Sequence, residues 1–260
     1  MSNSYIVTGV SSGLGASVSN ALKSSGFTVV GIDWRGSPDI KADLSKEVEV
    51  QRAMEIAISL CPNPSGVVSN AGLSPVHENR NEIIDVNWFS AKFVLDFSLE
   101  YLAAEGGSSA VAISSIGAAV GGDPILEDYL HSDDRESALN YLEDLHASDP
   151  NSSGIIAYSS CKAAIARYVR RNAQFWGNRG VRLNAIAPGK MDTSMLDGLL
   201  ADPVLSPGVV NLPKGVEETG HPDQVSEVVQ FLLSAKSSFV HGQIIYVDGG
   251  TEAIMRPDIV

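Results

Sequence analysis

The sequence is poor in cysteine, in positive charge and in long apolar runs, and each shortage excludes a class of protein. Two cysteines, Cys61 and Cys161, supply neither a disulfide framework nor a zinc site, and the five histidines show no metal-ligand spacing. With 18 basic against 31 acidic residues the net charge is −13, so a nucleic acid or an anionic lipid surface would repel the protein. No run approaches the ~18 apolar residues of a membrane span. An expected strand at residues 5–8 leaves no room for a signal peptide ahead of it. We therefore expect a cytoplasmic protein that binds no metal, nucleic acid or membrane.

The remaining composition favours one large α/β domain spanning residues 1–260, because 44% of the residues are hydrophobic and only 19% are charged. Short apolar runs without strict alternation predict strands buried on both faces. These runs lie at residues 5–8, 27–33, 66–69, 110–114, 181–187 and 243–247, with a very short strand near 40–42. Amphipathic segments between them predict helices at residues 16–25, 46–59, 81–104, 158–177 and 223–235. This alternation indicates a doubly wound parallel sheet of about seven strands.

Residues 121–153 differ from the rest of the chain, because they hold nine acidic residues and a single basic one, Arg135. Ala138, Leu142 and Leu145 recur at helical spacing, and Asp133 and Asp134 precede them as residues at a helix N-terminus do. The pattern predicts an acidic helical insertion with one apolar face. The insertion is either a solvent-exposed segment that packs on the rest of the domain or part of an interface with another subunit.

A glycine-rich turn follows the first expected strand and opens the first expected helix. It runs from Thr8 to Gly15 and offers Gly9, Ser12, Gly13 and Leu14 as candidate ligands of a dinucleotide. Glycines let the backbone approach a pyrophosphate, while the helix N-terminus supplies free N–H groups and a positive dipole. The alternative is a plain glycine-rich turn between a strand and a helix.

The second strand ends in Asp33, twenty positions after Gly13. A carboxylate there can accept hydrogen bonds from the ribose hydroxyls of the adenosine and would repel a 2′-phosphate, so NAD is favoured over NADP. Arg35 could contact such a phosphate, but Asp33 stands in its way. Asp43 and Leu44 either border the adenine ring or, for Asp43, cap the next helix.

Tyr158 and Lys162 are spaced i, i+4 on an expected helix, which puts them on one face. A tyrosine titrates near pH ~10, so acid–base work at neutral pH requires stabilisation of its phenolate by ~2–3 pKa units. A neighbouring ammonium supplies part of that stabilisation. The pair is therefore a candidate for proton transfer.

These motifs, in this order, resemble the short-chain dehydrogenase/reductase superfamily over essentially the whole chain. The matching elements are the turn from Thr8 to Gly15, Asn70-Ala71-Gly72, Asn87, Ser114-Ser115, Tyr158 with Lys162, and Pro188-Gly189. The resemblance implies a Rossmann fold and hydride exchange between a nicotinamide and an alcohol/ketone pair. It also implies a catalytic tetrad of Asn87, Ser115, Tyr158 and Lys162. Cofactor contacts implied in the same way come from Asn70, Ala71, Gly72, Tyr158, Lys162, Pro188, Gly189 and Thr193.

Within that superfamily the chain looks most like the bacterial 3-alpha-hydroxysteroid dehydrogenase/carbonyl reductase group, a resemblance that includes the long gap between Ser115 and Tyr158, 43 positions where most relatives need about a dozen. We therefore expect NAD-dependent interconversion of a hydrophobic secondary alcohol, possibly a 3-alpha-hydroxysteroid, and its ketone. The alternative substrates are terpenoid, aromatic or aliphatic alcohols, and the alternative from another class is a non-catalytic dinucleotide-binding protein. Residues 190–215 would form a substrate lid, although Met195, Leu196 and Leu199 would suit ordinary core packing as well.

The resemblance also carries an expectation about assembly. Most relatives associate through the helices that carry the equivalents of Asn87 and Tyr158, and the insertion at residues 121–153 emerges beside that surface. Acidic insertions facing their own copies across a two-fold axis would repel each other. We expect a homodimer formed elsewhere, through the last strand and the helix at residues 223–235.

Overall fold

A seven-stranded parallel sheet forms the centre of the computed structural model, which describes residues 3–105, 107–216 and 219–259. The strand order is β3-β2-β1-β4-β5-β6-β7, and every pairing between neighbours is parallel. The bounds are β1 Ser4–Thr8, β2 Thr28–Asp33, β3 Ile40–Lys41, β4 Gly66–Ser69, β5 Ser109–Ile113, β6 Arg182–Pro188 and β7 Ile244–Val247. The predicted doubly wound α/β fold is confirmed.

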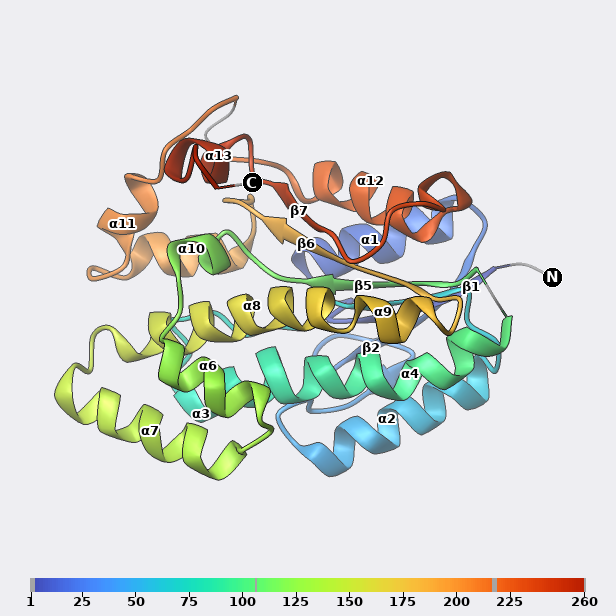
Figure 1. The fold of residues 1–260 in the computed structure, drawn as a ribbon, viewed down its shortest axis with the longest axis horizontal. Helices are drawn as coiled ribbons and strands as arrows, with labels where there is room; N and C mark the ends of the chain where they lie inside the picture. Colours follow the sequence, from blue (N-terminus) through green and yellow to red (C-terminus); the bar gives the residue numbers. More distant parts are fainter. Residues whose placement is uncertain (1–2, 106, 217–218, 260) are drawn as a thin grey trace.

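Helices cover both faces of the sheet (Figure 1). One face carries α1 (Gly13–Ser24) and α12 (Pro222–Leu233), and the opposite face carries α2 (Glu47–Leu60), α4 (Ala91–Glu105), α8 (Ser153–Arg171) and α9 (Ala173–Gly177). Each layer encloses its own apolar cluster, one around α1 and α12 and the other around α2, α4 and α8. β4, β5 and β6 are buried along their whole length, which explains why their sequences show no polar alternation.

Two predicted helices have different bounds in the structure. The helix expected at residues 81–104 consists of α3 (Arg80–Ile84), a π-helical turn at Asp85–Ser90 and α4. The helix expected at residues 158–177 begins earlier, with α8 at Ser153, and is interrupted at Asn172 before α9. Both differences arise from backbone hydrogen bonding that apolar periodicity does not encode.

The acidic segment is helical, as expected. Between β5 and α8 lie α5 (Gly117–Val120), α6 (Pro124–His131) and α7 (Arg135–Ser148). The side chain of Asp123 caps α6, and that of Asp134 caps α7. Ala138 and Leu142 of α7 are buried, while Leu145 is half-buried. The insertion packs beside α3 and α8 through one apolar face (Figure 1).

The remaining helices follow β6 and β7. They are α10 (Ser194–Ala201), α11 (Ser206–Val210), a 3₁₀ turn at Ala235–Ser237 and α13 (Thr251–Met255). Within the ranges described above, no helix is both long enough and apolar enough to cross a membrane.

Candidate active site

The candidate residues collect at the carboxyl ends of the strands, where the strand order reverses between β1 and β4. Ligands of open α/β sheets bind in the crevice at such a point. Thr8, the last residue of β1, ties the two strands together, because its hydroxyl accepts the backbone N–H groups of Asn70 and Ala71, each at 3.0 Å. Sequence reasoning missed this role of Thr8; a hydroxyl residue directly before the glycine turn is the signal that could have shown it.

The glycine turn brings its backbone close to the start of α1. A Cβ atom on Gly15 would lie 1.9 Å from the carbonyl oxygen of Gly9, so no larger residue fits without movement of the backbone. Gly9 and Gly13 both have positive φ values, of 75° and 51°. Ser12 is exposed and Leu14 is buried beneath the turn. The turn therefore has the close backbone approach and exposed N-terminus that a pyrophosphate requires.

Asp33 lies at the end of β2 beside this turn, with 8% of its surface exposed. Its carboxylate accepts the backbone N–H of Ser11 at 2.9 Å and that of Arg35 at 3.0 Å. A carboxylate has about four acceptor positions, so two N–H groups fix its orientation and leave capacity for ribose hydroxyls. The guanidinium of Arg35 stacks on the Trp34 ring, 4.2 Å from its centroid. The residues present therefore fit the hydroxyl groups of an adenosine ribose.

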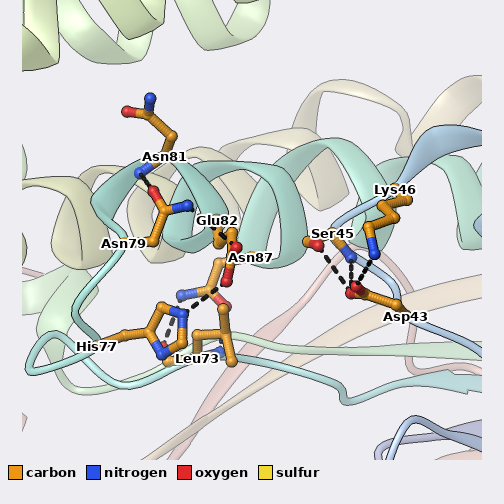
Figure 2. Close-up of polar contacts among 9 residues, drawn as sticks. All are labelled: Asp43, Ser45, Lys46, Leu73, His77, Asn79, Asn81, Glu82 and Asn87. Carbon is orange, nitrogen blue, oxygen red and sulfur yellow. Dashed lines mark hydrogen bonds and ion pairs between the residues drawn. The ribbon is translucent and has the colours of Figure 1, made fainter.

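Asp43 and Leu44 follow β3, near the start of α2. The Asp43 carboxylate accepts the N–H and the hydroxyl of Ser45 and pairs with Lys46 at 2.8 Å (Figure 2). Burial raises the pKa of Asp43, but the hydrogen bonds from Lys46 and Ser45 outweigh it and the net shift is downward. The N-cap of α2 is Lys46, so the alternative that Asp43 caps this helix is wrong; Asp43 caps a turn ahead of it. Leu44 is buried.

Lys162 and Tyr158 lie on one face of α8, with the Lys162 ammonium 5.7 Å from the centroid of the Tyr158 ring. Lys162 is 5% exposed, and its Nζ donates to the carbonyl oxygen of Ile113 at 3.0 Å. Burial lowers the pKa of this ammonium to about 8. Lys162 is therefore a cation held in a largely desolvated position beside the phenol.

The two serines after β5 have different surroundings. Ser114 Oγ donates to the backbone carbonyl of Lys162 at 2.7 Å, which fixes α8 against the sheet. The hydroxyl of Ser115 accepts the N–H of Gly117 at 3.1 Å and lies close enough to the Tyr158 hydroxyl to act on the pKa of that phenol. Of the pair, Ser115 is thus the serine that meets the Tyr158 hydroxyl.

Burial raises the pKa of Tyr158, and the Ser115 hydrogen bond acts in the opposite direction without reversing the shift. The expected lowering of the Tyr158 pKa by Lys162 is not found among the protein groups as they lie, since the causes of the shift are burial, Ser115 and Cys161. Proton transfer near neutral pH needs further positive charge close to the phenol oxygen.

Asn87 lies in the π-helical turn and is completely buried. Its Oδ1 accepts the N–H of Leu73 at 2.7 Å, and its Nδ2 donates to the Leu73 carbonyl at 3.0 Å (Figure 2). A Cβ placed on Gly72 would lie 3.1 Å from Asn87 Oδ1 and 3.4 Å from Lys162 Nζ, so all three groups converge there. This contact could not be predicted from the sequence, because it uses only the backbone N–H and C=O of Leu73, which every residue except proline offers.

Comparison with known proteins decides the family. The chain is 33% identical to the 3-alpha-hydroxysteroid dehydrogenase/carbonyl reductase of Comamonas testosteroni, over 97% of each protein. It is 29% identical to the cis-4-hydroxycyclohexanecarboxylate dehydrogenase of Sinomonas cyclohexanicum, over 96% of each. The family described as Enoyl-(Acyl carrier protein) reductase matches residues 143–252. The chain belongs to the short-chain dehydrogenase/reductase family.

A solved structure is similar over the whole fold of this short-chain dehydrogenase/reductase. The 3-alpha-hydroxysteroid dehydrogenase from Pseudomonas sp. B-0831, complexed with NADH, superposes with a TM-score of 0.92 at 32% identity and covers 99% of this chain and 100% of that one. The chain is an oxidoreductase of the type that acts on alcohols and ketones.

In this dehydrogenase/reductase the segment after β6 passes close to the end of β7. A Cβ on Gly189 would lie 2.7 Å from Asp248 Cα, and the Pro188 carbonyl accepts the N–H of Ile116 at 2.8 Å. Thr193 is the N-cap residue of α10, and its methyl group would be 3.4 Å from a Cβ on Gly13. Thr193 therefore faces the glycine turn, beside the candidate cofactor residues.

The segment expected to be a lid contains α10 and α11, and neither helix has a buried residue. Met195, Leu196 and Leu199 are half-buried, so the alternative that they form ordinary core is wrong. A Cβ on Gly198 of α10 would lie 3.5 Å from Val76, in the loop between β4 and α3. This segment thus extends from the glycine turn to the loop that Asn87 contacts.

The remaining titratable groups add no further ligand set. Cys161 precedes Lys162 but is buried, and burial raises the pKa of its thiol to about 12, which suits packing. Cys61 is likewise buried, and neither cysteine is in a disulfide. In the described part of the chain, no three His, Cys, Asp or Glu side chains form a group able to hold a metal ion.

Proposed function

We propose that this protein is an NAD(H)-dependent oxidoreductase that interconverts a hydrophobic secondary alcohol and its ketone, with a 3-alpha-hydroxysteroid as the favoured substrate. Asn87, Ser115, Tyr158 and Lys162 are the proposed tetrad. The observation that carries the proposal is the position of the buried Lys162 ammonium, 5.7 Å from the centroid of the Tyr158 ring, with Ser115 close to the Tyr158 hydroxyl, at the carboxyl edge of the sheet.

In this mechanism Tyr158 accepts the hydroxyl proton of the alcohol, or donates it to the ketone in the reverse reaction. Ser115 donates a hydrogen bond to the substrate oxygen as negative charge develops there. Lys162 stabilises the phenolate of Tyr158 and binds hydroxyls of the nicotinamide ribose. When bound, NAD supplies the hydride acceptor for oxidation, and its positively charged ring adds the charge that the raised pKa of Tyr158 requires.

The proposed cofactor contacts follow the crevice from one end to the other. Gly9, Ser12, Gly13 and Leu14 hold the pyrophosphate; Asp33, Asp43 and Leu44 surround the adenosine; Asn70, Ala71, Gly72, Pro188, Gly189 and Thr193 border the nicotinamide half. The enclosed Asp33 carboxylate supports NAD over NADP, because a 2′-phosphate would meet a negative charge there. The NADH bound to the Pseudomonas relative supports the same choice.

The proposed substrate class rests on chemistry that the named relatives share. Both the 3-alpha-hydroxysteroid and the cis-4-hydroxycyclohexanecarboxylate of those relatives carry a secondary hydroxyl on a saturated six-membered ring. The half-buried Met and Leu side chains of α10 suit an apolar ring system. The alternative remains a dehydrogenase for non-steroid terpenoid, aromatic or aliphatic secondary alcohols.

We propose a cytoplasmic homodimer built through β7 and α12. All four residues of β7 are only half-buried, although the strand belongs to the sheet. Phe231 of α12 is exposed, and Phe239, in the connection to β7, is fully exposed. α6 of the acidic insertion packs against α8, the helix through which the resemblance implies that most relatives associate, and this supports an interface elsewhere.

The test is Tyr158→Phe, with Tyr101→Phe near the far end of α4 as the matched control. Turnover should fall ~10²–10⁴-fold in Tyr158→Phe, the range that a general acid–base group contributes, whereas NADH binding stays within about twofold. Turnover is measured by steady-state NADH absorbance with steroids, cyclohexanols, monoterpenols and aryl alcohols. NADH binding is measured by fluorescence titration. A Tyr158→Phe enzyme that keeps more than ~10% of kcat excludes Tyr158 as the acid–base group. No turnover of any substrate by the unaltered protein would favour the non-catalytic alternative.

A further inference from the structure

The π-helical turn that carries Asn87 needs support from outside its own segment. π-Helical turns are rare, because their hydrogen bonds close over five residues and pack less favourably than those of an α-helix. Residues 85–90 adopt this geometry between two ordinary helices, α3 and α4. Nothing in the composition of Asp85–Ser90 requires a π-turn. The reason for the π-turn must therefore lie in what contacts it.

The start of this turn and the first turn of α4 behind it are both ion-paired to the junction of α6 and α7 in the acidic insertion. At the start of the turn, the Asp85 carboxylate accepts two bonds from the Arg135 guanidinium, each 2.7 Å long. Just after its end, Lys92 pairs with Asp133 at 3.1 Å and with Asp96 at 3.0 Å. The two ion pairs have opposite polarity: the insertion supplies the base, Arg135, in the first and the acid, Asp133, in the second.

The connection between α6 and α7 is shaped for this contact. Asp133 has a φ of 57°, the one non-glycine residue with positive φ among those the structure describes. Arg135 is the single Lys or Arg in residues 121–153. Its partner Asp85 has a side chain only 10% exposed, and a two-pronged Arg–carboxylate pair fixes orientation as well as distance. A third contact comes from His131 of α6, whose ring meets Trp88 of the π-turn edge-on at 5.3 Å.

We propose that Asp133 and Arg135 form a clamp that holds the π-turn and so positions Asn87 for Lys162. The inference rests on the proposed function, since it gives the clamp a role in the same tetrad. Asn87 lies two residues after Asp85. Its side-chain amide reaches the backbone N–H and C=O of Leu73 only while the turn keeps the one residue that a π-turn has in excess of an α-helical turn. Relaxation to an α-helix would rotate Asn87 by ~100° about the helix axis, away from Leu73 and from the space beside Lys162. Asp133 and Arg135 are positioning residues, not catalytic ones.

The test compares Arg135→Ala with Arg167→Ala. Arg167 of α8 pairs with Glu127 of α6, so it also ties the insertion to the body, but not through the π-turn. Hydrogen exchange read by mass spectrometry should show the Leu73 N–H losing protection at least tenfold in Arg135→Ala and keeping it in Arg167→Ala. This measurement needs neither cofactor nor substrate. Unchanged protection of Leu73 in Arg135→Ala overturns the clamp.

Kinetics provide the second measurement, with the secondary alcohol that gives the highest turnover in the screen above. Arg135→Ala should lower kcat about tenfold or more and leave the KM for NAD unchanged, whereas Arg167→Ala should affect thermal stability alone. In an Asn87→Ala background, the Arg135→Ala change should have no further effect on kcat, because its route to the site is already removed. Additive effects of the two substitutions overturn the proposal.

Failure of the clamp and failure of the proposed function give different results. If Tyr158→Phe is inactive but Arg135→Ala turns over like the unaltered protein, the tetrad stands and the clamp is wrong. If Tyr158→Phe is active, the proposed function is wrong. The exchange of Leu73 then still decides whether Arg135 supports the π-turn.

Discussion

Replacing Lys162 with Met should stabilise the fold while abolishing turnover. Burial lowers the pKa of Lys162 from 10.5 to about 8, and each pKa unit corresponds to about 1.4 kcal/mol. Holding the ammonium charged in the folded protein at pH 7 therefore costs about 3 kcal/mol. Met removes that cost but also the hydrogen bond from the charged Nζ to the Ile113 carbonyl, and hydrogen bonds of charged groups are worth about 2 kcal/mol. We expect Lys162→Met to raise the free energy of unfolding by about 1 kcal/mol at pH 7.

The effect depends on pH in a direction that the pKa fixes. Because the folded pKa of Lys162 lies below the unfolded one, the unfolded chain binds more protons between pH 8 and pH 10.5. The cost of burying Lys162 therefore disappears as the pH rises through this window. The stability advantage of Lys162→Met should be complete below pH 8 and absent near pH 10.5.

Urea unfolding of both proteins at pH 7, 8, 9 and 10 measures this difference directly, provided that the m-values agree. Lys23→Met, at an exposed position near the end of α1, is the control and should shift stability by less than ~0.5 kcal/mol at every pH. A Lys162→Met protein no more stable than the unaltered one at pH 7 would refute the reasoning, as would an advantage that persists undiminished at pH 10.

Three further predictions concern the turn, the cofactor and the assembly. Gly15→Ala places a Cβ 1.9 Å from the Gly9 carbonyl oxygen, so overpacking should lower the free energy of unfolding by ~2–3 kcal/mol and Tm by about 5–10 °C. The control is Gly208→Ala, which has open space around its Cβ and should leave Tm within ~2 °C. Asp33→Ala should weaken NAD binding and narrow the preference for NAD over NADP; equal use of both cofactors by the unaltered protein would contradict the role of Asp33. The mass in solution should be that of a dimer, and deletion of residues 123–151 should permit larger assemblies; a tetramer joined through α8 in the complete protein would contradict the proposed interface.

The strands were predictable because each buried strand is a continuous apolar run, and β4, β5 and β6 are buried throughout. The glycine turn and the Tyr158–Lys162 pair were predictable because their chemistry depends on local spacing along one element. The π-turn at Asp85–Ser90 was not predictable, since its hydrogen bonding depends on the tertiary contacts of Arg135 and Lys92. Apolar periodicity gave one helix over residues 81–104, where the structure has three segments.

The surroundings of the site were harder to predict than its members. Ser114 contacts the α8 backbone at Lys162, whereas Ser115 lies near the Tyr158 hydroxyl. The residue types of two adjacent serines do not show which way each side chain points. From its position in the sequence, Asp43 could either cap the next helix or border the adenine ring. The first alternative is excluded only by the structure, in which α2 begins at Glu47. Long-range backbone contacts, such as Leu73 with Asn87, leave no mark in the sequence.

The junction of β1 with β4, which Thr8 fastens, has a consequence for how the protein matures. The proposed cofactor crevice lies between two parts of the sheet that are joined by one strand pairing, because β1 pairs with β2 on one side and with β4 on the other. A chain emerging from the ribosome cannot form the crevice until both halves have docked, and parallel pairing over such separations is slow. Dinucleotide affinity in a refolding experiment should therefore appear late, together with the last cooperative phase. A nucleotide-coated resin would then separate completed molecules from partly folded ones.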